Sequence, residues 1–219
     1  MSKLTFSKIS LNDLKSFVTL KEQGIGDYPW LNVKNVAIDE QEQNYLQAIQ
    51  SHLLNYDTLL MNEATIWARA IYPLLLLSEH SNIQAWSEVS LKAQYGDIEL
   101  EGIADGVIGK CVTGFLETPY LVVVEAKRGL ENANPLLQLY GQLLAAAYLN
   151  WKNDGNEFQT IYGCYTIADV WKFFKAEIKG INTETKLTMR IETSREYVEK
   201  LEIKTIFQIL KMIVSEKTI

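Results

Sequence analysis

The chain has 219 residues, of which 47% are hydrophobic and 22% are charged, and its net charge at pH 7 is −6. This length and composition fit one well-packed domain and argue against a disordered chain. The excess of acidic residues argues against a protein that holds long DNA tightly by itself, because neutralising phosphates supplies most of the non-specific affinity.

The first part of the chain, up to about Asp39, is mixed in composition, and a short helix is predicted over residues 11–21. From Glu40 to about Tyr56 apolar residues recur at helical spacing. Asp39 is suited to cap this helix, because its carboxylate can accept an N–H of the first turn. A second helix begins near Glu63, and Pro73 within its apolar pattern predicts a kink or a break.

From Trp86 onward the apolar pattern changes toward the alternation that is typical of strands. Residues 86–94 and 98–103 predict two strands of a hairpin around Gly96 and Asp97. Residues 104–112 continue either as a third strand or as a turn, and Pro119 interrupts the chain before the next strand. The remaining predicted elements are a helix over 136–151, strands over 160–167, 169–178 and 187–192, and a helix over 202–215. We therefore expect one α/β domain over residues 41–219, with residues 1–40 as an N-terminal extension packed on its core.

An acid, a second acid and a lysine occupy positions in two of these predicted strands. Leu121 to Val124 is an apolar run of the kind that is buried on both faces of a sheet. Glu125 and Lys127 follow directly, and they point to the same side because side chains alternate along a strand. Asp105 lies in the preceding segment, which could pair with this strand. Two carboxylates can hold a divalent cation and an ammonium can position a water, so the pattern indicates metal-assisted hydrolysis of a phosphodiester.

The order of these residues resembles the PD-(D/E)XK nuclease superfamily, also called restriction-endonuclease-like. Asp105 matches the first acid of the motif and Glu125-Ala126-Lys127 matches its E-x-K, while Ala104 stands where the motif has proline. The resemblance implies that Asp105, Glu125 and the carbonyl of Ala126 hold Mg²⁺ or Mn²⁺. It implies that Lys127 orients the attacking water, or deprotonates it if burial and the metal lower the lysine pKa. It also implies a core with a mixed central β-sheet flanked by α-helices.

Two predicted helices extend the resemblance to roughly half of the chain. The segment 61–75 resembles the first core helix of the type I restriction-subunit branch, whose glutamate, here Glu63, would reach the metal directly or through water. The helix after the E-x-K resembles one that often turns a glutamine toward the active centre. Here Gln142, or Gln138 four residues earlier, would steady Lys127 or the phosphate. Glu88 is similar to a further acid of the type I branch and is a candidate accessory residue.

Each of these residues also has a simpler interpretation. Asp105 could be a turn aspartate beside Gly106, and Glu125 with Lys127 could be an exposed pair at a strand end. Glu63 could be an exposed acid at a helix N-terminus, where the dipole favours it. The main alternative to an endonuclease is a binding or scaffold protein that keeps the nuclease fold without turnover. A protein-interaction module in which the E-x-K is accidental is a third hypothesis.

Other site chemistries fit the sequence less well. Neither histidine, His52 or His80, has neighbours of metal-ligand type, and the glycine motifs of NTPases and dinucleotide enzymes are absent. Cys111 and Cys164 predict two reduced, buried thiols. No apolar run is long enough to span a bilayer, and the first residues lack the apolar region of a signal peptide. We expect a cytoplasmic protein without a membrane partner, with nucleic acid, DNA first, as its ligand. A protein partner that supplies DNA affinity and an oligomeric state are both left open.

Overall fold

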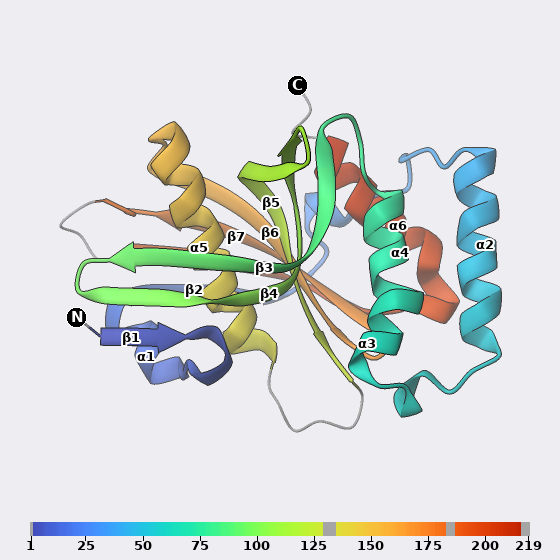
Figure 1. The fold of residues 1–219 in the computed structure, drawn as a ribbon, viewed down its shortest axis with the longest axis horizontal. Coiled ribbons are helices and arrows are strands. Elements are labelled where there is room, and N and C mark those ends of the chain that lie inside the picture. Colours follow the sequence, from blue (N-terminus) through green and yellow to red (C-terminus); the bar gives the residue numbers. More distant parts are fainter. Residues whose placement is uncertain (1, 129–134, 183–186, 216–219) are drawn as a thin grey trace.

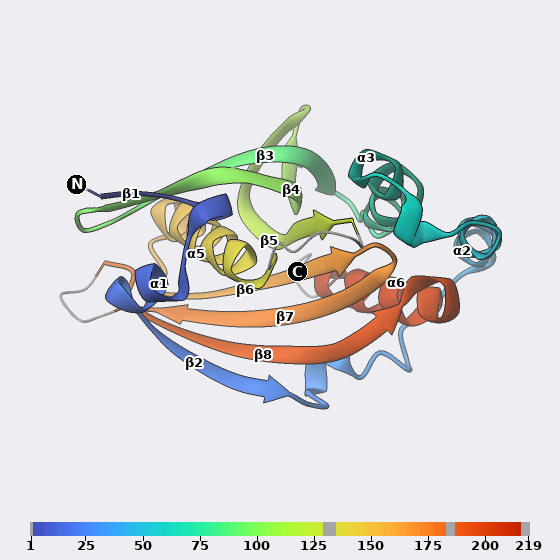
Figure 2. The same ribbon diagram turned by 90° about the horizontal axis from the view of Figure 1, so that it is seen from below.

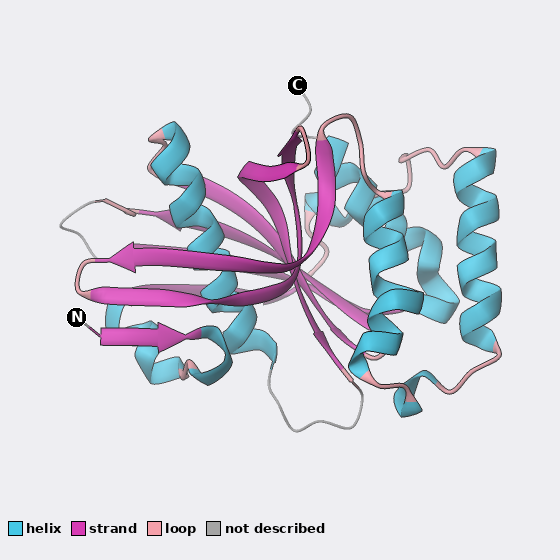
Figure 3. Cartoon of the chain, in the orientation of Figure 1, coloured by secondary structure: helices cyan, strands magenta, loops and turns pink. Residues whose placement is uncertain are grey.

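An eight-stranded mixed sheet organises the part of the chain that the computed structural model describes, residues 2–128, 135–182 and 187–215 (Figures 1 and 3). The strands are β1 (Ser2–Thr5), β2 (Val18–Ile25), β3 (Ile83–Tyr95), β4 (Ile98–Val112), β5 (Phe115–Lys127), β6 (Phe158–Ile167), β7 (Val170–Lys179) and β8 (Leu187–Val198). The helices are α1 (Leu11–Phe17), α2 (Glu40–Leu54), α3 (Glu63–Ile66), α4 (Tyr72–Leu77), α5 (Pro135–Asp154) and α6 (Glu199–Ser215). The predicted mixed α/β class is confirmed.

The strand order is β1-β4-β5-β6-β7-β8-β2, and β3 also pairs with β4. Strands β3, β4 and β5 are antiparallel neighbours, as are β6, β7 and β8. Strands β5 and β6 are parallel, and α5 lies between them in the chain, as a parallel crossover requires. This crossover places α5 against β5 and β6. It covers the face of the sheet toward which Glu125, near the end of β5, points.

Residues 2–25 contribute a strand to each of two distant parts of the sheet. Strand β1 pairs in parallel with β4, and β2 pairs in parallel with β8 (Figure 2). The helix predicted over 11–21 is shorter than expected, since α1 ends at Phe17. Ser10 and Asp13 form a reciprocal cap at its start. The β-branched residues Val18 and Thr19 then favour the strand, and pairing with β8 stabilises it.

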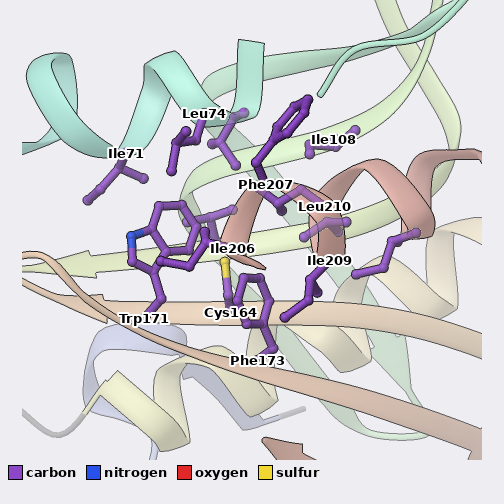
Figure 4. Packing of buried hydrophobic residues seen from close by; sticks show 14 of the residues in the cluster. Ile71, Leu74, Ile108, Cys164, Trp171, Phe173, Ile206, Phe207, Ile209 and Leu210 are labelled. Carbon is purple, nitrogen blue, oxygen red and sulfur yellow. The ribbon is translucent and has the colours of Figure 1, made fainter. Parts of the chain in front are cut away.

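Two hydrophobic clusters cover the two faces of the sheet. One contains residues of α2, α4 and α6, and Figure 4 shows Leu74, Cys164 and Phe207 among the side chains that meet there. The other contains residues of α5 and α1. Along β5, Val122 and Val124 belong to the first cluster and Val123 to the second, so this strand is buried on both faces as predicted.

Local signals predicted several elements correctly. Asp39 and Glu42 form a reciprocal cap at the start of α2. Strands β3 and β4 form the expected hairpin, in which Gly96 has a positive φ of 58°. Residues 104–112 continue β4 as a strand. Both cysteine side chains are buried, and no helix in the described ranges is long and apolar enough to cross a membrane.

Pro119 is the clearest departure from the predicted elements, because it lies inside β5 and does not precede the strand. The pairing of β4 with β5 shifts its register at Gly109, which pairs with Tyr120 while Lys110 pairs with Glu117. The two residues skipped by this bulge include Pro119. Its missing N–H is therefore not needed by the ladder, which is how proline is accommodated inside a sheet.

Candidate functional site

Glu125 is fully buried near the end of β5, with 0% of its surface exposed. Its Oε1 lies 2.6 Å from the Nζ of Lys127, and its Oε2 accepts a hydrogen bond of 2.6 Å from the Nε2 of Gln142 on α5. Gln142 is also fully buried, whereas Gln138, one turn earlier, is half-buried. The structure thus brings together the E-x-K and a helix glutamine, and the interpretation of Glu125 as an exposed acid is wrong.

Asp105 reaches this cluster because β4 and β5 separate beside it. Their pairing ends at Gly106 and Val124, and beyond that point Asp105 Oδ2 accepts the backbone N–H of Ala126 at 2.6 Å. The carboxylate therefore takes the place of a ladder carbonyl, and it lies next to the backbone that joins Glu125 to Lys127. Asp105 belongs to a continuous strand, so its interpretation as a turn residue is also wrong.

Glu63 and Trp67 face the site from the helical segment on the other side. Asn62 caps α3, and a π-helical turn, Trp67–Ile71, separates α3 from α4. Pro73 explains this turn, because it has no N–H to donate to the carbonyl of Arg69, its partner in a regular α-helix. The N–H of Tyr72 bonds instead to the carbonyl of Trp67, five residues earlier. The kink expected at Pro73 is thus a π turn.

A pocket with a volume of about 350 Å³ opens between this helical segment and strands β3 to β5. Its lining includes Glu63, Trp67, Ser87, Glu88, Asp105 and Ala126. The indole N–H of Trp67 donates to the hydroxyl of Ser87 at 3.3 Å. The missing side chain of Gly106 lets the Trp67 ring lie against β4, since a Cβ at that position would lie 2.6 Å from the ring. The sequence did not single out Trp67 as a site residue, although its position one turn after Glu63 was a usable signal.

Glu88 lies opposite Asp105 on the neighbouring strand, between the pairs Ser87–Gly106 and Val89–Ala104. Like charges in directly opposite positions destabilise a sheet. Glu88 also has a φ of 53°, a left-handed conformation that costs a non-glycine residue about 1–2 kcal/mol. Strain of this kind concentrates at functional sites. Glu88 therefore combines two unfavourable features at a position that lines the pocket.

The charges of the cluster shift the pKa values of its members. Burial raises the pKa of Asp105, and the charge of Glu88 adds to this, while the N–H of Ala126 and the charge of Lys127 act against it. Burial and the charge of Asp105 raise the pKa of Glu125 to about 7, against the opposing effects of Lys127 and Gln142. The site therefore holds two acidic groups that disfavour each other's ionisation.

Lys127 does not have the lowered pKa that a lysine base needs. Burial lowers its pKa, but the hydrogen bond and charge of Glu125, together with the charges of Asp105 and Glu63, outweigh burial and raise it above the ordinary value. At neutral pH the side chain is an ammonium ion. It can orient a water or stabilise a negative charge, and the expectation that it deprotonates the water is not supported.

The oxygen atoms of the site have the chemistry that Mg²⁺ and Mn²⁺ prefer, but they do not form a complete cage. Within the described ranges, no three side chains of Asp, Glu, His or Cys are grouped closely enough to hold a metal ion. Within the site, Gln142 Oε1 has neither a hydrogen bond nor an ion pair with the described residues, whereas Glu125 Oε1 has its ion pair with Lys127. Buried polar atoms normally have a hydrogen-bond partner, and a water bound in the site would supply it. The oxygens of the site are thus of the kind that a hard cation prefers, and water molecules would have to supply most of the ligands of such an ion.

Comparison with protein-family models finds no match, and a search of curated proteins finds no significantly similar sequence.

Proposed function

We propose that this chain is a metal-dependent endonuclease that hydrolyses phosphodiester bonds of DNA and is built on a restriction-endonuclease-like core. The observation that carries the proposal is the environment of Glu125. This fully buried carboxylate is held by Lys127 on one oxygen and by Gln142 on the other. Asp105 lies close enough for its charge to raise the pKa of Glu125. Such a group is hard to explain as a device for stability, because a buried carboxylate needs compensation that an apolar residue would not.

The order of elements supports the proposed core. The first acid lies on β4, the E-x-K ends β5, and the glutamine lies on α5, which leads to the parallel strand β6. Glu63 enters from a helix that precedes all of these in the chain. This is the order of acids, lysine and glutamine that the resemblance to the PD-(D/E)XK superfamily implies.

Asp105, Glu125 and the carbonyl of Ala126 would hold the cation, with Glu63 helping through water. A bound Mg²⁺ or Mn²⁺ polarises a phosphate oxygen and lowers the pKa of a water molecule. The remaining tasks belong to the protein. Gln142 fixes the orientation of Glu125 through the 2.6 Å hydrogen bond. The ammonium of Lys127 positions the attacking water and stabilises the negative charge that develops on the phosphate.

A non-catalytic protein that uses this fold for binding or as a scaffold is the alternative. Two observations favour it: the net charge of −6, and the absence of a three-acid group among the described side chains. A scaffold does not need a metal, so it would be unaffected by loss of Glu125 except in stability. Metal binding separates the two hypotheses.

The test is a calorimetric titration of Mn²⁺ into the wild type and Glu125→Gln, followed by incubation of both with plasmid and single-stranded DNA. The matched control is Glu199→Gln, which changes another fully buried glutamate that does not line the pocket. We expect metal binding and cleavage in the wild type and the control, and neither in Glu125→Gln. Metal binding without cleavage would point to a missing protein partner. Absence of metal binding in the wild type would overturn the proposed mechanism and favour the non-catalytic alternative.

A further inference from the structure

The pocket beside Asp105 has one aromatic wall, and that wall is fixed in place. The indole of Trp67 is held by its hydrogen bond to Ser87, by close approach to Gly106, and by the ring of Tyr72, whose centroid lies 5.9 Å away. Trp67 is nevertheless only half-buried, because its remaining surface lines the pocket. A rigid aromatic face that is already ordered loses little entropy when it binds a flat partner.

We propose that this pocket receives an unpaired nucleobase, which stacks on Trp67, and that the substrate is therefore single-stranded or locally unwound nucleic acid. The inference rests on the proposed function for the position of the phosphate, which Asp105 and its neighbours would bind through the cation. Trp67 and Asp105 line the same pocket. In a nucleotide only the sugar separates the phosphate from its base, so one pocket can take both.

The size and composition of the pocket fit this ligand. Its volume of about 350 Å³ lies at the lower end of the range for small-molecule sites, roughly 300–1,000 Å³. Aromatic stacking accepts any base, because every base has a flat π-face. The acidic residues of the pocket, Glu63, Glu88 and Asp105, exclude an anion as the group that rests on Trp67. A neutral base next to a metal-bound phosphate avoids that repulsion.

A base inside a duplex cannot enter such a pocket, because it is paired and stacked. Extruding it costs a few kcal/mol, and the cost is smallest for a strand that is already unpaired. The charge of the chain points the same way. With 27 acidic and 21 basic residues, the protein is poorly suited to bind long duplexes by neutralising phosphates. Stacking on an aromatic ring adds about 1–3 kcal/mol per base, and this part of the affinity does not come from neutralising phosphates.

The test measures binding both in EDTA and in Ca²⁺, so that it does not depend on cleavage and a cation is present to hold the phosphate in one of the two conditions. Three fluorescein-labelled probes are compared by anisotropy: a 12-nucleotide single strand, the same strand in a duplex, and a strand of equal length in which every nucleotide is abasic. The variants are Trp67→Leu, which keeps apolar packing without an aromatic face, and Trp67→Phe, which keeps an aromatic face. Trp151→Leu is the matched control, since Trp151 is a half-buried tryptophan outside the pocket whose N–H bonds to Glu157. Thermal melting verifies that each variant folds.

We expect the wild type to prefer the base-bearing single strand over both other probes. Trp67→Leu should bind that strand about tenfold to a hundredfold more weakly and no longer distinguish it from the abasic strand. Trp67→Phe should retain most of the affinity, and Trp151→Leu should match the wild type. Equal binding by Trp67→Leu and the wild type, no preference for bases over abasic sugars, or no binding of any probe would overturn the inference.

Cleavage assays in Mn²⁺ distinguish this failure from failure of the proposed function. If the wild type cleaves duplex DNA and Trp67→Leu cleaves it equally well, the nuclease stands and the base pocket is wrong. If Trp67-dependent binding of the single strand is found but no probe is cleaved, the base pocket stands and the catalytic function is wrong.

Discussion

Two glutamates in the described part of the chain, Glu125 and Glu199, are fully buried. Glu125 lies two residues before the end of β5, and Glu199 begins α6 directly after β8. Burial is the main cause of a raised pKa in both, about 7 for Glu125 and about 8 for Glu199. Each also has an aspartate whose charge raises its pKa further, Asp105 in the first case and Asp169 in the second.

The partners of the two carboxylates differ. Glu125 has a cation, Lys127, and an amide donor, Gln142, and it adjoins residues that line an open pocket. Glu199 accepts a single hydrogen bond of 2.7 Å from the indole of Trp171, which is itself fully buried. Its second oxygen has no hydrogen-bond partner in the described part of the chain.

The comparison shows that a raised carboxylate pKa does not by itself identify a functional site. A sealed carboxylate like Glu199 is most easily accommodated in its neutral form. Glu125 is surrounded by groups that stabilise its ionised form, and its neighbouring acid lines a pocket. Only Glu125 lies beside a residue that lines an open pocket, and the following predictions test whether this arrangement binds a cation.

The largest expected effect is on cleavage. If the proposed function holds, Glu125→Gln should reduce the rate of Mn²⁺-dependent cleavage by roughly a thousandfold, because the proposed site would lose a charged metal ligand. Glu199→Gln should leave that rate within about twofold of the wild type, since it alters no group near the pocket. Initial rates of plasmid nicking measure both. Equal losses in the two variants would show that the loss reflects folding and not chemistry.

The second effect is on the pH dependence of stability, and here Glu199 dominates. Its pKa is about 8 in the folded protein, against an ordinary value of 4.5. The folded state therefore binds the proton more tightly, and the wild type loses stability as the pH rises from about 4.5 to 8. This loss is at most about 5 kcal/mol. In Glu199→Gln the amide oxygen can still accept the indole N–H of Trp171, and the side chain no longer ionises. This variant should therefore be more stable than the wild type near pH 9.

Urea unfolding of the wild type and Glu199→Gln at pH 5, 7 and 9 measures this difference. Glu125→Gln serves as the comparison. The pKa of Glu125 in the folded protein is about 7, closer to its ordinary value, so the loss of stability caused by its ionisation should be smaller and should end near pH 7. Parallel stability profiles for the wild type and Glu199→Gln would show that Glu199 does not change its protonation state on folding.

The third effect is stabilisation by metal. Mn²⁺ at a hundred times its Kd should raise the free energy of unfolding by about 2.7 kcal/mol in the wild type and in Glu199→Gln. Glu125→Gln should show no increase, and EDTA should reverse the increase in the other two proteins. Thermal denaturation with and without Mn²⁺ measures this. A shift in all three proteins would place the metal elsewhere.

The smallest effect concerns a hydrogen bond to Asp169, the aspartate beside Glu199; together with Trp171 these two residues are called the Glu199 cluster. Thr58, which is 1% exposed, donates a 2.7 Å hydrogen bond to Asp169 Oδ1. Thr58→Val keeps the shape of the side chain and removes the donor, which should destabilise the protein by about 1–2 kcal/mol. Metal binding should be unchanged in a calorimetric titration. A weaker Mn²⁺ affinity in this variant would show that the two clusters are coupled.

The parts of the fold and site that sequence patterns predicted are those set by neighbouring residues. The cap at Asp39 depends on residues within one helical turn, and the hairpin at Gly96 depends on a few residues of turn. Glu125 and Lys127 share a face because they are two positions apart. The position of Gln142 in the site was predicted only through the resemblance, because no residue near Glu125 or Gln142 in the sequence indicates that the two side chains meet.

The parts that sequence patterns missed depend on distant partners. Strand β2 forms because it pairs with β8, and Pro119 fits inside β5 because it lies in a bulge of that strand opposite Gly109 and Lys110. Glu199 was placed outside the final helix, since nothing in a polar segment indicates that tertiary packing will bury a carboxylate. The positive φ of Glu88 is likewise a property of the folded pair of strands. Local propensity cannot predict these features.

The two strands of residues 2–25 have a consequence for how the protein folds. Val18 pairs with Leu187 and Ser2 with Ile98, so this segment joins partners that are far from it along the chain. Such contacts require the closure of long loops, and they slow folding. Until the segment docks, β8 and the outer part of β4 are unpaired strand edges, which are the surfaces that pair wrongly with other chains. We expect the docking of residues 2–25 to limit the rate of folding, and aggregation to compete with folding before that step.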